Sequence, residues 1–227
     1  MTSRTRIKVC GLREAATLQA AVEAGADAVG FVFAPSPRRI EPSAARPLIA
    51  TLPAFVEPVG LFVDAPASLV REAAALAGLR TVQLHGAEPP ETVEALSPLR
   101  VIKAMAFDAQ DPEASLARWR GLAFPPAALL LDSPPAAGVA GGTGRRFDWG
   151  GLARWLAKGG AVGLPPLIVA GGLTPSNVGE LIAQVAPYAV DVSSGVESSR
   201  GVKDAGLIAA FCEGVRIADR SRGARVG

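Results

Sequence analysis

The sequence of 227 residues has few of the side chains that bind metals or form disulfides. It contains one histidine and two cysteines, Cys10 and Cys212, which lie far apart in the chain. Metal sites built from histidine or cysteine need several ligands at close spacing, so we expect no metal site. A disulfide framework is not expected either, and a cytoplasmic location is the default for such a chain.

Strong charge of one sign and long apolar runs are also missing. There are 23 basic and 21 acidic residues, a net charge of +2, so we expect no nucleic-acid partner. No uninterrupted apolar run reaches the roughly 18 residues of a membrane-spanning helix, and residues 1–9 lack the apolar core of a signal peptide. The densest basic stretch follows Ile217, and we expect a flexible, solvated tail over residues 218–227.

Nucleotide-binding signatures are absent as well. The run Gly141-Gly142-Thr143-Gly144 lacks the lysine of a P-loop and does not match the dinucleotide-binding fingerprint. We therefore expect no nucleotide cofactor. Together with the missing metal ligands, this leaves no cofactor to be expected.

A repeated pattern is present instead. Hydrophobic residues make up 49% of the chain, which indicates a globular protein. Eight times, a short apolar run is followed by a loop and then by an Ala/Leu-rich segment with helical spacing. The expected strands are Ile7–Val9, Ala28–Phe33, Val59–Val63, Thr81–Leu84, Val101–Ala104, Ala128–Leu131, Leu167–Val169 and Val190–Val192, and the expected helices begin near Glu14, Ser43, Ala67, Pro90, Asp111, Trp149, Pro175 and Lys203.

The eight strand–helix units predict one α/β domain over residues 1–217. Strands that alternate with helices pair in parallel through right-handed crossovers, and eight units favour closure into a (β/α)8 TIM barrel. An open doubly wound sheet is the alternative. Helix starts are also predicted at Thr174-Pro175, Asp111-Pro112 and Pro42-Ser43.

Scarce and reactive residues gather at the strand ends. In a barrel of this kind the active site lies at the carboxyl ends of the strands. The only histidine, His85, follows the fourth strand, while Cys10 follows the first and Asp132 the sixth. A chance distribution would not place all three at one end of the barrel. The clustering therefore predicts an enzyme with its site at this end.

Position alone leaves the roles of these residues open. A thiolate acts as a general base, and a carboxylic acid as a general acid, when the surroundings shift the pKa toward neutrality. Cys10 can equally be a small buried hydrophobic residue, Asp132 a helix cap or loop anchor, and His85 a structural residue. Lys103, inside the fifth strand, is a candidate to pair with an acid inside the barrel.

Two further groups indicate an anionic substrate. Gly171-Gly172 and Ser193-Ser194-Gly195 follow the seventh and eighth strands, where such barrels bind phosphate through backbone N–H groups. A tight turn is the alternative interpretation of Gly171-Gly172. Arg38 and Arg39 follow the second strand, where a guanidinium suits a planar carboxylate, and a solvated loop charge is the alternative.

Short motifs at these positions run from the first strand to the last helix. They are Lys8-Val9-Cys10-Gly11-Leu12, Ser36-Pro37-Arg38, Val82-Gln83-Leu84-His85-Gly86, Leu131-Asp132, Gly141-Gly142-Thr143-Gly144 with Phe147-Asp148-Trp149, Ala170-Gly171-Gly172-Leu173 and Asp191-Val192-Ser193-Ser194-Gly195-Val196-Glu197. In this order and spacing the chain resembles phosphoribosylanthranilate isomerase. The resemblance implies a parallel eight-stranded barrel of the ribulose-phosphate-binding type.

The resemblance also implies residue roles. Cys10 matches the family's general base, and Asp132 matches its general acid. Arg38 matches the arginine that contacts the anthranilate carboxylate. The implied phosphate-binding residues are Gly171, Gly172, Ser194 and Gly195, and His85 and Asp191, within the matching motifs, are further substrate-binding candidates.

The implied reaction is an Amadori rearrangement, an aldose–ketose isomerisation in L-tryptophan biosynthesis that needs no cofactor. It converts N-(5-phosphoribosyl)anthranilate to 1-(2-carboxyphenylamino)-1-deoxyribulose 5-phosphate, so the expected partner is a small phosphorylated substrate. The oligomeric state stays open between monomer and homodimer. One alternative is another phosphate-binding barrel isomerase, against which Cys10 argues. The other is a non-catalytic phosphosugar-binding barrel, which would have no reason to keep both Cys10 and Asp132.

Overall fold

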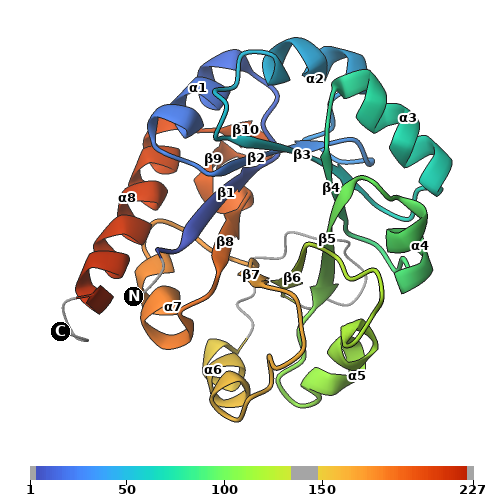
Figure 1. The fold of residues 1–227 in the computed structure, drawn as a ribbon. Helices are drawn as coiled ribbons and strands as arrows, with labels where there is room; N and C mark the ends of the chain where they lie inside the picture. Colours follow the sequence, from blue (N-terminus) through green and yellow to red (C-terminus); the bar gives the residue numbers. More distant parts are fainter. Residues whose placement is uncertain (1–3, 134–147, 224–227) are drawn as a thin grey trace.

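The structure, a computed structural model, describes residues 4–133 and 148–223. Within them, eight parallel strands pair in chain order and close into a barrel (Figure 1). The strands are β1 (Arg6–Cys10), β2 (Ala28–Val32), β3 (Glu57–Phe62), β4 (Thr81–Leu84), β5 (Arg100–Ala106), β6 (Ala128–Asp132), β7 (Leu167–Val169) and β8 (Ala189–Val192). The predicted TIM barrel is confirmed, and the open sheet is wrong, because β1 also pairs with β8.

Helices surround the barrel, as Figure 1 shows. They are α1 (Ala15–Glu23), α2 (Pro42–Ile49), α3 (Ala67–Ala77), α4 (Pro90–Ala95), α5 (Pro112–Leu116), α6 (Trp149–Ala157), α7 (Val178–Val185) and α8 (Ala205–Gly223), with 3-10 helices η1 (Ala117–Trp119) and η2 (Ser194–Val196). A short antiparallel hairpin of β9 (Glu197–Ser199) and β10 (Val202–Lys203) separates β8 from α8. None of the described helices is long and apolar enough to cross a membrane.

The strands bury side chains on both faces, which explains their almost continuous apolar sequences. On β6, Leu129 and Leu131 belong to the large cluster beneath the helices, whereas Ala128 and Leu130 belong to a second cluster. The second cluster fills the barrel interior and includes the neighbouring Ile102, Ala104, Ile168, Ala170 and Ala189. Small residues at many of these inner positions let the strands close around a packed core.

One predicted helix start is confirmed at atomic detail and another is wrong. The Asp111 carboxylate accepts a hydrogen bond from the Ala114 N–H (3.1 Å), and Pro112 opens α5. Thr174-Pro175 does not start α7, which begins at Val178. The Asn177 side chain instead accepts from the Thr174 N–H (2.9 Å) and donates to the Gly172 carbonyl (2.9 Å), so this segment is a closed loop after β7.

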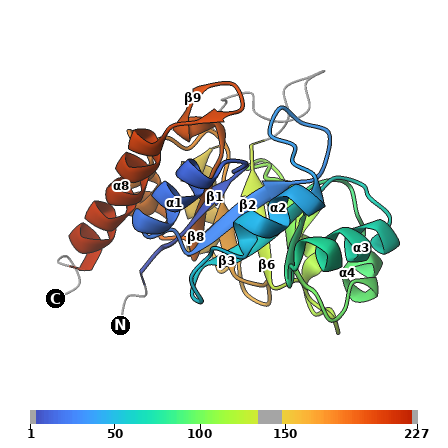
Figure 2. The same cartoon turned by 90° about the horizontal axis from the view of Figure 1, so that it is seen from above.

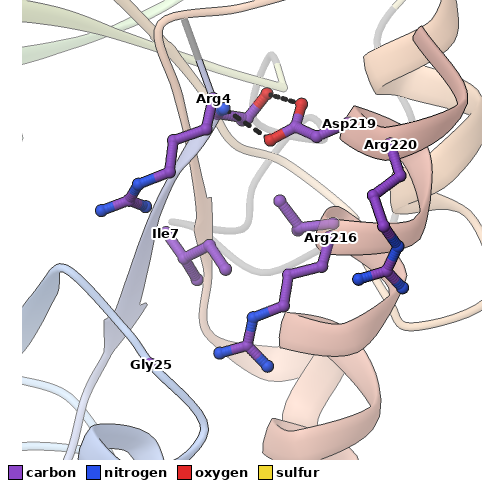
Figure 3. Close-up of a pocket in the computed structure, with 8 residues that line it drawn as sticks. Arg4, Ile7, Gly25, Arg216, Asp219 and Arg220 are labelled. Carbon is purple, nitrogen blue, oxygen red and sulfur yellow. Dashed lines mark hydrogen bonds between the residues drawn. The ribbon is translucent and has the colours of Figure 1, made fainter. Parts of the chain in front are cut away.

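The end of the chain also differs from the expectation. Residues 218–223, expected as a flexible tail, are the last turns of α8, while residues 224–227 lie outside the described part. Arg220 and Arg222 sit at the helix C-terminus, where positive charge is favourable. Asp219 accepts hydrogen bonds from the Thr5 N–H (2.7 Å) and hydroxyl (2.8 Å), which attaches α8 to the start of β1 (Figure 3).

A hollow of about 410 Å³ lies beside this attachment, at the amino-terminal end of the barrel (Figure 3). Its charged groups are paired within the chain, because Arg4 binds Asp27 (2.8 Å) and Arg220 binds Glu213 (2.7 Å). In Figure 2 the start of β1 and the end of α8 lie at this end of the barrel, and β9 lies at the other. The strand ends that the sequence singled out therefore lie away from this hollow.

Candidate functional site

The closed barrel brings the predicted residues to one mouth. Cys10 ends β1, Asp132 ends β6, and His85 directly follows β4. Arg38 lies in the loop after β2, and the glycine- and serine-rich loops follow β7 and β8. The motif at residues 141–144 and Phe147 fall outside the described residues. Among the described residues, no group of three or more histidine, cysteine or acidic side chains could hold a metal ion.

Asp132 and His85 are in contact across the mouth. The His85 Nε2 lies 3.3 Å from the Asp132 Oδ2, and both side chains are about one-third exposed (32% and 31%). The Gln83 side-chain nitrogen lies 2.8 Å from the His85 Nδ1. This contact holds the imidazole ring beside Asp132. The other Asp132 oxygen accepts from the Ser133 N–H (2.7 Å).

The thiol of Cys10 is buried at the edge of the mouth, with 4% of the residue exposed. Gly30 on β2 makes room for it, since a Cβ at that position would lie 2.7 Å from the Cys10 sulfur. Burial raises the pKa of this thiol, while the positive charges of Lys8 and Lys203 act in the opposite direction. The site therefore holds a thiol in a dry environment with two cations close by.

A buried ion pair lies next to Cys10, two residues closer to the amino-terminal end of β1. Lys8 and Cys10 are two residues apart on β1 and so share the inner face of the barrel. The Lys8 ammonium donates to Asp191 on β8 at 2.8 Å, and both side chains are buried. Burial lowers the pKa of Lys8, but the charges of Asp191 and Cys10 outweigh it and leave the pKa raised. Asp191, predicted to bind substrate, thus has a partner within the chain.

The Arg38 guanidinium is bound to a carboxylate of the same chain. Its Nε and Nη2 donate to the two oxygens of Glu197 at 2.6 and 2.9 Å. The side chain crosses Gly11, where a Cβ would lie 2.8 Å from the Arg38 Cδ. Arg39, the alternative that the sequence left open, pairs with the exposed Glu41 at 2.9 Å. Of the two arginines, Arg38 is therefore the one held at the site.

Glycines allow the loops after β7 and β8 to pack closely. Gly171 and Gly172 have φ values of 81° and 66°, which L side chains rarely adopt. A Cβ on Gly171 would lie 2.8 Å from the Asp132 Oδ1, so this loop touches the candidate acid. A Cβ on Gly195 would overlap the Leu173 carbonyl at 1.7 Å, so the two loops are in contact. A larger residue at Gly171 or Gly195 would require the backbone to move.

A second network lies beside the mouth. Lys103 donates to Glu88 (2.9 Å) and to the Gly86 carbonyl (2.7 Å). It was expected to meet an acid inside the barrel, but Glu88 belongs to the loop between β4 and α4. The same carboxylate accepts from the Asp64 N–H (2.8 Å), so it joins the loops after β3 and β4. This anchor holds the segment that carries His85.

Several residues of the site had no predicted role. They are Lys8, Gln83, Glu197 and Lys203, which surround the predicted Cys10, His85 and Arg38. Lys8 and Gln83 share a detectable signal, because each is a polar residue inside an apolar strand, two positions before a candidate. Glu197 and Lys203 carry no such signal, since most of their neighbours in the segment are polar or glycine.

Comparison with known proteins connects this site to one family. Residues 7–214 match the sequence model of the family described as N-(5'phosphoribosyl)anthranilate (PRA) isomerase. An N-(5'-phosphoribosyl)anthranilate isomerase of Moorella thermoacetica is 47% identical over 214 residues, which cover 94% of this chain and 91% of that protein.

Solved structures agree with the sequence match. The phosphoribosyl anthranilate isomerase of Thermotoga maritima is 38% identical, with a TM-score of 0.82, over 93% of this chain and 98% of the other. Another structure of such an isomerase holds reduced 1-(o-carboxyphenylamino)-1-deoxyribulose 5-phosphate. It is 37% identical with a TM-score of 0.78, over 93% of this chain and 98% of its own.

Proposed function

The chain belongs to the N-(5'-phosphoribosyl)anthranilate isomerase family, and on that premise we propose which of its residues carry out the reaction. The protein is an isomerase of tryptophan biosynthesis that converts an aldose amine into a ketose amine and takes a phosphorylated small molecule as substrate. The observation that carries the assignment of roles is the position of Cys10 and Asp132, on β1 and β6, at one mouth of the barrel.

Asp132 is the general acid in this proposal. In its protonated form it donates a proton to the ring oxygen of the ribose, and the C1–O bond breaks as the anthranilate nitrogen forms a C=N bond with C1. The ring oxygen becomes a hydroxyl group, and the product of this step is an open-chain protonated Schiff base, because the nitrogen keeps its proton. The position of the Asp132 side chain at the mouth, about one-third exposed, supports this role because a substrate can reach the carboxyl group there.

Cys10 is the general base. Its thiolate removes the proton from C2, the electrons of that C–H bond form a C=C bond between C1 and C2, and the Schiff base nitrogen becomes an amine. The resulting enolamine tautomerises to the ketone. A buried thiol resists ionisation, so the nearby charges of Lys8 and Lys203 support the role by favouring the thiolate.

The remaining candidates bind the two ends of the substrate. Arg38 receives the anthranilate carboxylate, supported by a guanidinium held rigidly at the mouth. Gly171, Gly172, Ser194 and Gly195 receive the phosphate, supported by the close packing of the loops after β7 and β8. His85 lies beside the ribose, where it contacts Asp132. Asp191 acts on the site through Lys8, its buried partner.

The test of this proposal is turnover of phosphoribosylanthranilate formed in situ, followed by loss of its fluorescence. Cys10→Ser should lower kcat by about 10²–10⁴-fold, because serine is a far weaker base than a thiolate. Cys212→Ser is the matched control, since Cys212 is an equally buried cysteine on α8, away from the mouth. A Cys10→Ser protein with normal turnover would contradict the assignment of the base.

A cytoplasmic location accompanies this function as a further proposal. It is supported by the role in amino acid biosynthesis and by two cysteines that are both free and buried. Fractionation of cells that express the protein would test it, and recovery outside the cytoplasmic fraction would contradict it.

A further inference from the structure

We propose that Glu197 is a positioning residue that orients Arg38, and thereby determines preference for a substrate with a ring carboxylate. The inference rests on the proposed role of Arg38 and adds to it a residue that touches no substrate. It follows from the bonding of Glu197, from the groups that remain available on Arg38, and from the charge balance of the cluster.

The Glu197 carboxylate is buried and fully used. Its side chain is 4% exposed, and it accepts from Arg38 (2.6 and 2.9 Å), Lys203 (2.6 Å) and the Gly201 N–H (3.0 Å). These bonds, against the opposing effect of burial, lower its pKa to about 2. The group is therefore ionised throughout the working pH range, with its oxygens committed to donors of the chain.

This bonding selects one edge of the Arg38 guanidinium. The pair uses Nε and Nη2, which form the side edge of the planar fork. The end edge, made of Nη1 and the second N–H of Nη2, is outside this pair and is the edge that forms two parallel bonds with another carboxylate. The Arg38 side chain packs against Gly11, where a Cβ would lie 2.8 Å from the Arg38 Cδ. Among the described residues Arg38 pairs with Glu197 through its side edge, so the end edge is left for a ligand.

The charges of the cluster suit an anionic ligand. Arg38 and Lys203 contribute two positive charges and Glu197 one negative, which leaves a net charge of +1 for one carboxylate to neutralise. Without Glu197, two neighbouring cations would repel each other and Arg38 would lose its fixed orientation. An ordinary exposed loop arginine would have to give up rotamer freedom on binding, and Arg38 has already done so.

The hairpin that carries this cluster also reaches the candidate base. Lys203 donates to the Ser193 carbonyl (2.9 Å), and the Ser193 hydroxyl donates to the Cys10 carbonyl (3.1 Å). Figure 2 shows β9 at the mouth end of the barrel. The residues after β8 therefore hold the carboxylate-binding arginine and the base in a common frame, so the aromatic end and the C2 atom of one substrate are placed together.

Two ligands that differ only in the ring carboxylate test the proposal. The first is reduced 1-(o-carboxyphenylamino)-1-deoxyribulose 5-phosphate, and the second is its analogue without the carboxylate. By calorimetry, Glu197→Gln should weaken binding of the first ligand about 10- to 100-fold, the usual size of a lost charge-assisted pair, and of the second less than about 3-fold. A merely structural role would weaken both ligands equally, and that result would overturn the proposal.

Coupling to Arg38 gives an independent check. In an Arg38→Ala background, Glu197→Gln should cause no further loss of affinity for the carboxylated ligand, because its effect passes through Arg38. Additive losses would overturn the proposal. Glu41→Gln is the matched control, since it removes the exposed partner of the neighbouring Arg39 and should leave both affinities unchanged.

Folding and function are separated by two further measurements. If Glu197→Gln does not fold by circular dichroism, Glu197→Asp keeps the charge on a shorter side chain and should show a smaller loss, again confined to the carboxylated ligand. A wild-type protein that neither turns over phosphoribosylanthranilate nor binds the ligand would contradict the proposed function. A wild type that does both, with Glu197→Gln keeping the full carboxylate preference, would contradict the role of Glu197 alone.

Discussion

Both ends of the barrel carry arginine–carboxylate pairs, but the two ends use them differently. At the mouth, Arg38 and Lys203 share one buried carboxylate, and the cluster is tied to the backbone of Cys10. At the amino-terminal end, Arg4 pairs with Asp27 while 64% of its side chain is exposed. Buried pairs are costly to break and hold geometry, whereas exposed pairs contribute little. The position of a pair in the barrel therefore indicates whether it serves the reaction or only the surface.

The largest effect is expected at the mouth itself. Asp132→Asn should lower kcat by about 10²–10⁴-fold without changing the melting temperature, because the amide cannot donate the proton that opens the ring. Asp108→Asn is the matched control, as an exposed aspartate that follows the neighbouring strand β5. The measurement is steady-state turnover. Equal rates for Asp132→Asn and Asp108→Asn would contradict the role of Asp132 as general acid.

The buried Lys8–Asp191 pair should contribute more to the free energy of unfolding than the exposed charges do. Lys8→Met should lower the free energy of unfolding by about 3–5 kcal/mol, because it leaves the Asp191 carboxylate buried without its partner. Urea denaturation measures this loss. Lys158→Met, at the exposed end of α6, should change the free energy little. A loss of unfolding free energy for Lys8→Met as small as that for Lys158→Met would contradict the stabilising role of the buried pair.

The cluster of Arg38, Glu197 and Lys203 predicts a dependence of stability on pH. The pKa of Glu197, about 2, lies below its ordinary value of 4.5, so its contribution is complete above pH 4.5 and is lost as pH falls toward 2. The shift corresponds to at most about 3 kcal/mol. The difference in unfolding free energy between wild type and Glu197→Gln should shrink over this range. A difference that stays constant with pH would contradict the lowered pKa.

The smallest effect is expected at the amino-terminal end. Arg4→Ala should lower the free energy of unfolding by about 0–1 kcal/mol and leave kcat unchanged, because its pair with Asp27 is largely exposed. Thermal melts and turnover together check this. A loss as large as that of Lys8→Met would abolish the contrast between the two ends.

Much of the architecture could be predicted from the sequence, because barrel strands are buried on both faces and read as apolar runs. β4 and β7 match the predicted ranges, and the other strands differ by one to three residues at their ends. The start of α7 was wrong, because Asn177 closes a loop where Thr174-Pro175 suggested a helix. The basic stretch after Ile217 continues α8, because Asp219 binds Thr5 at the far end of the chain.

Candidate residues could be predicted where their position at the end of a strand identified them. They could not be predicted where their role depends on a partner that is distant in the sequence. Cys10, His85 and Asp132 follow directly from their places at strand ends. The pairing of Arg38 with Glu197 joins segments 159 residues apart, and neither segment shows by itself that its charge is buried. Only the closed barrel brings the loops after β2 and β8 together.

The burial of the lysines also determines how the protein can be chemically modified. The chain has four lysines, and Lys8, Lys103 and Lys203 are held in buried ion pairs. Lys158, at the end of α6, is exposed. Of these four lysines, amine-reactive dyes and coupling resins should therefore attach at Lys158, while the lysine amines around the mouth stay unmodified.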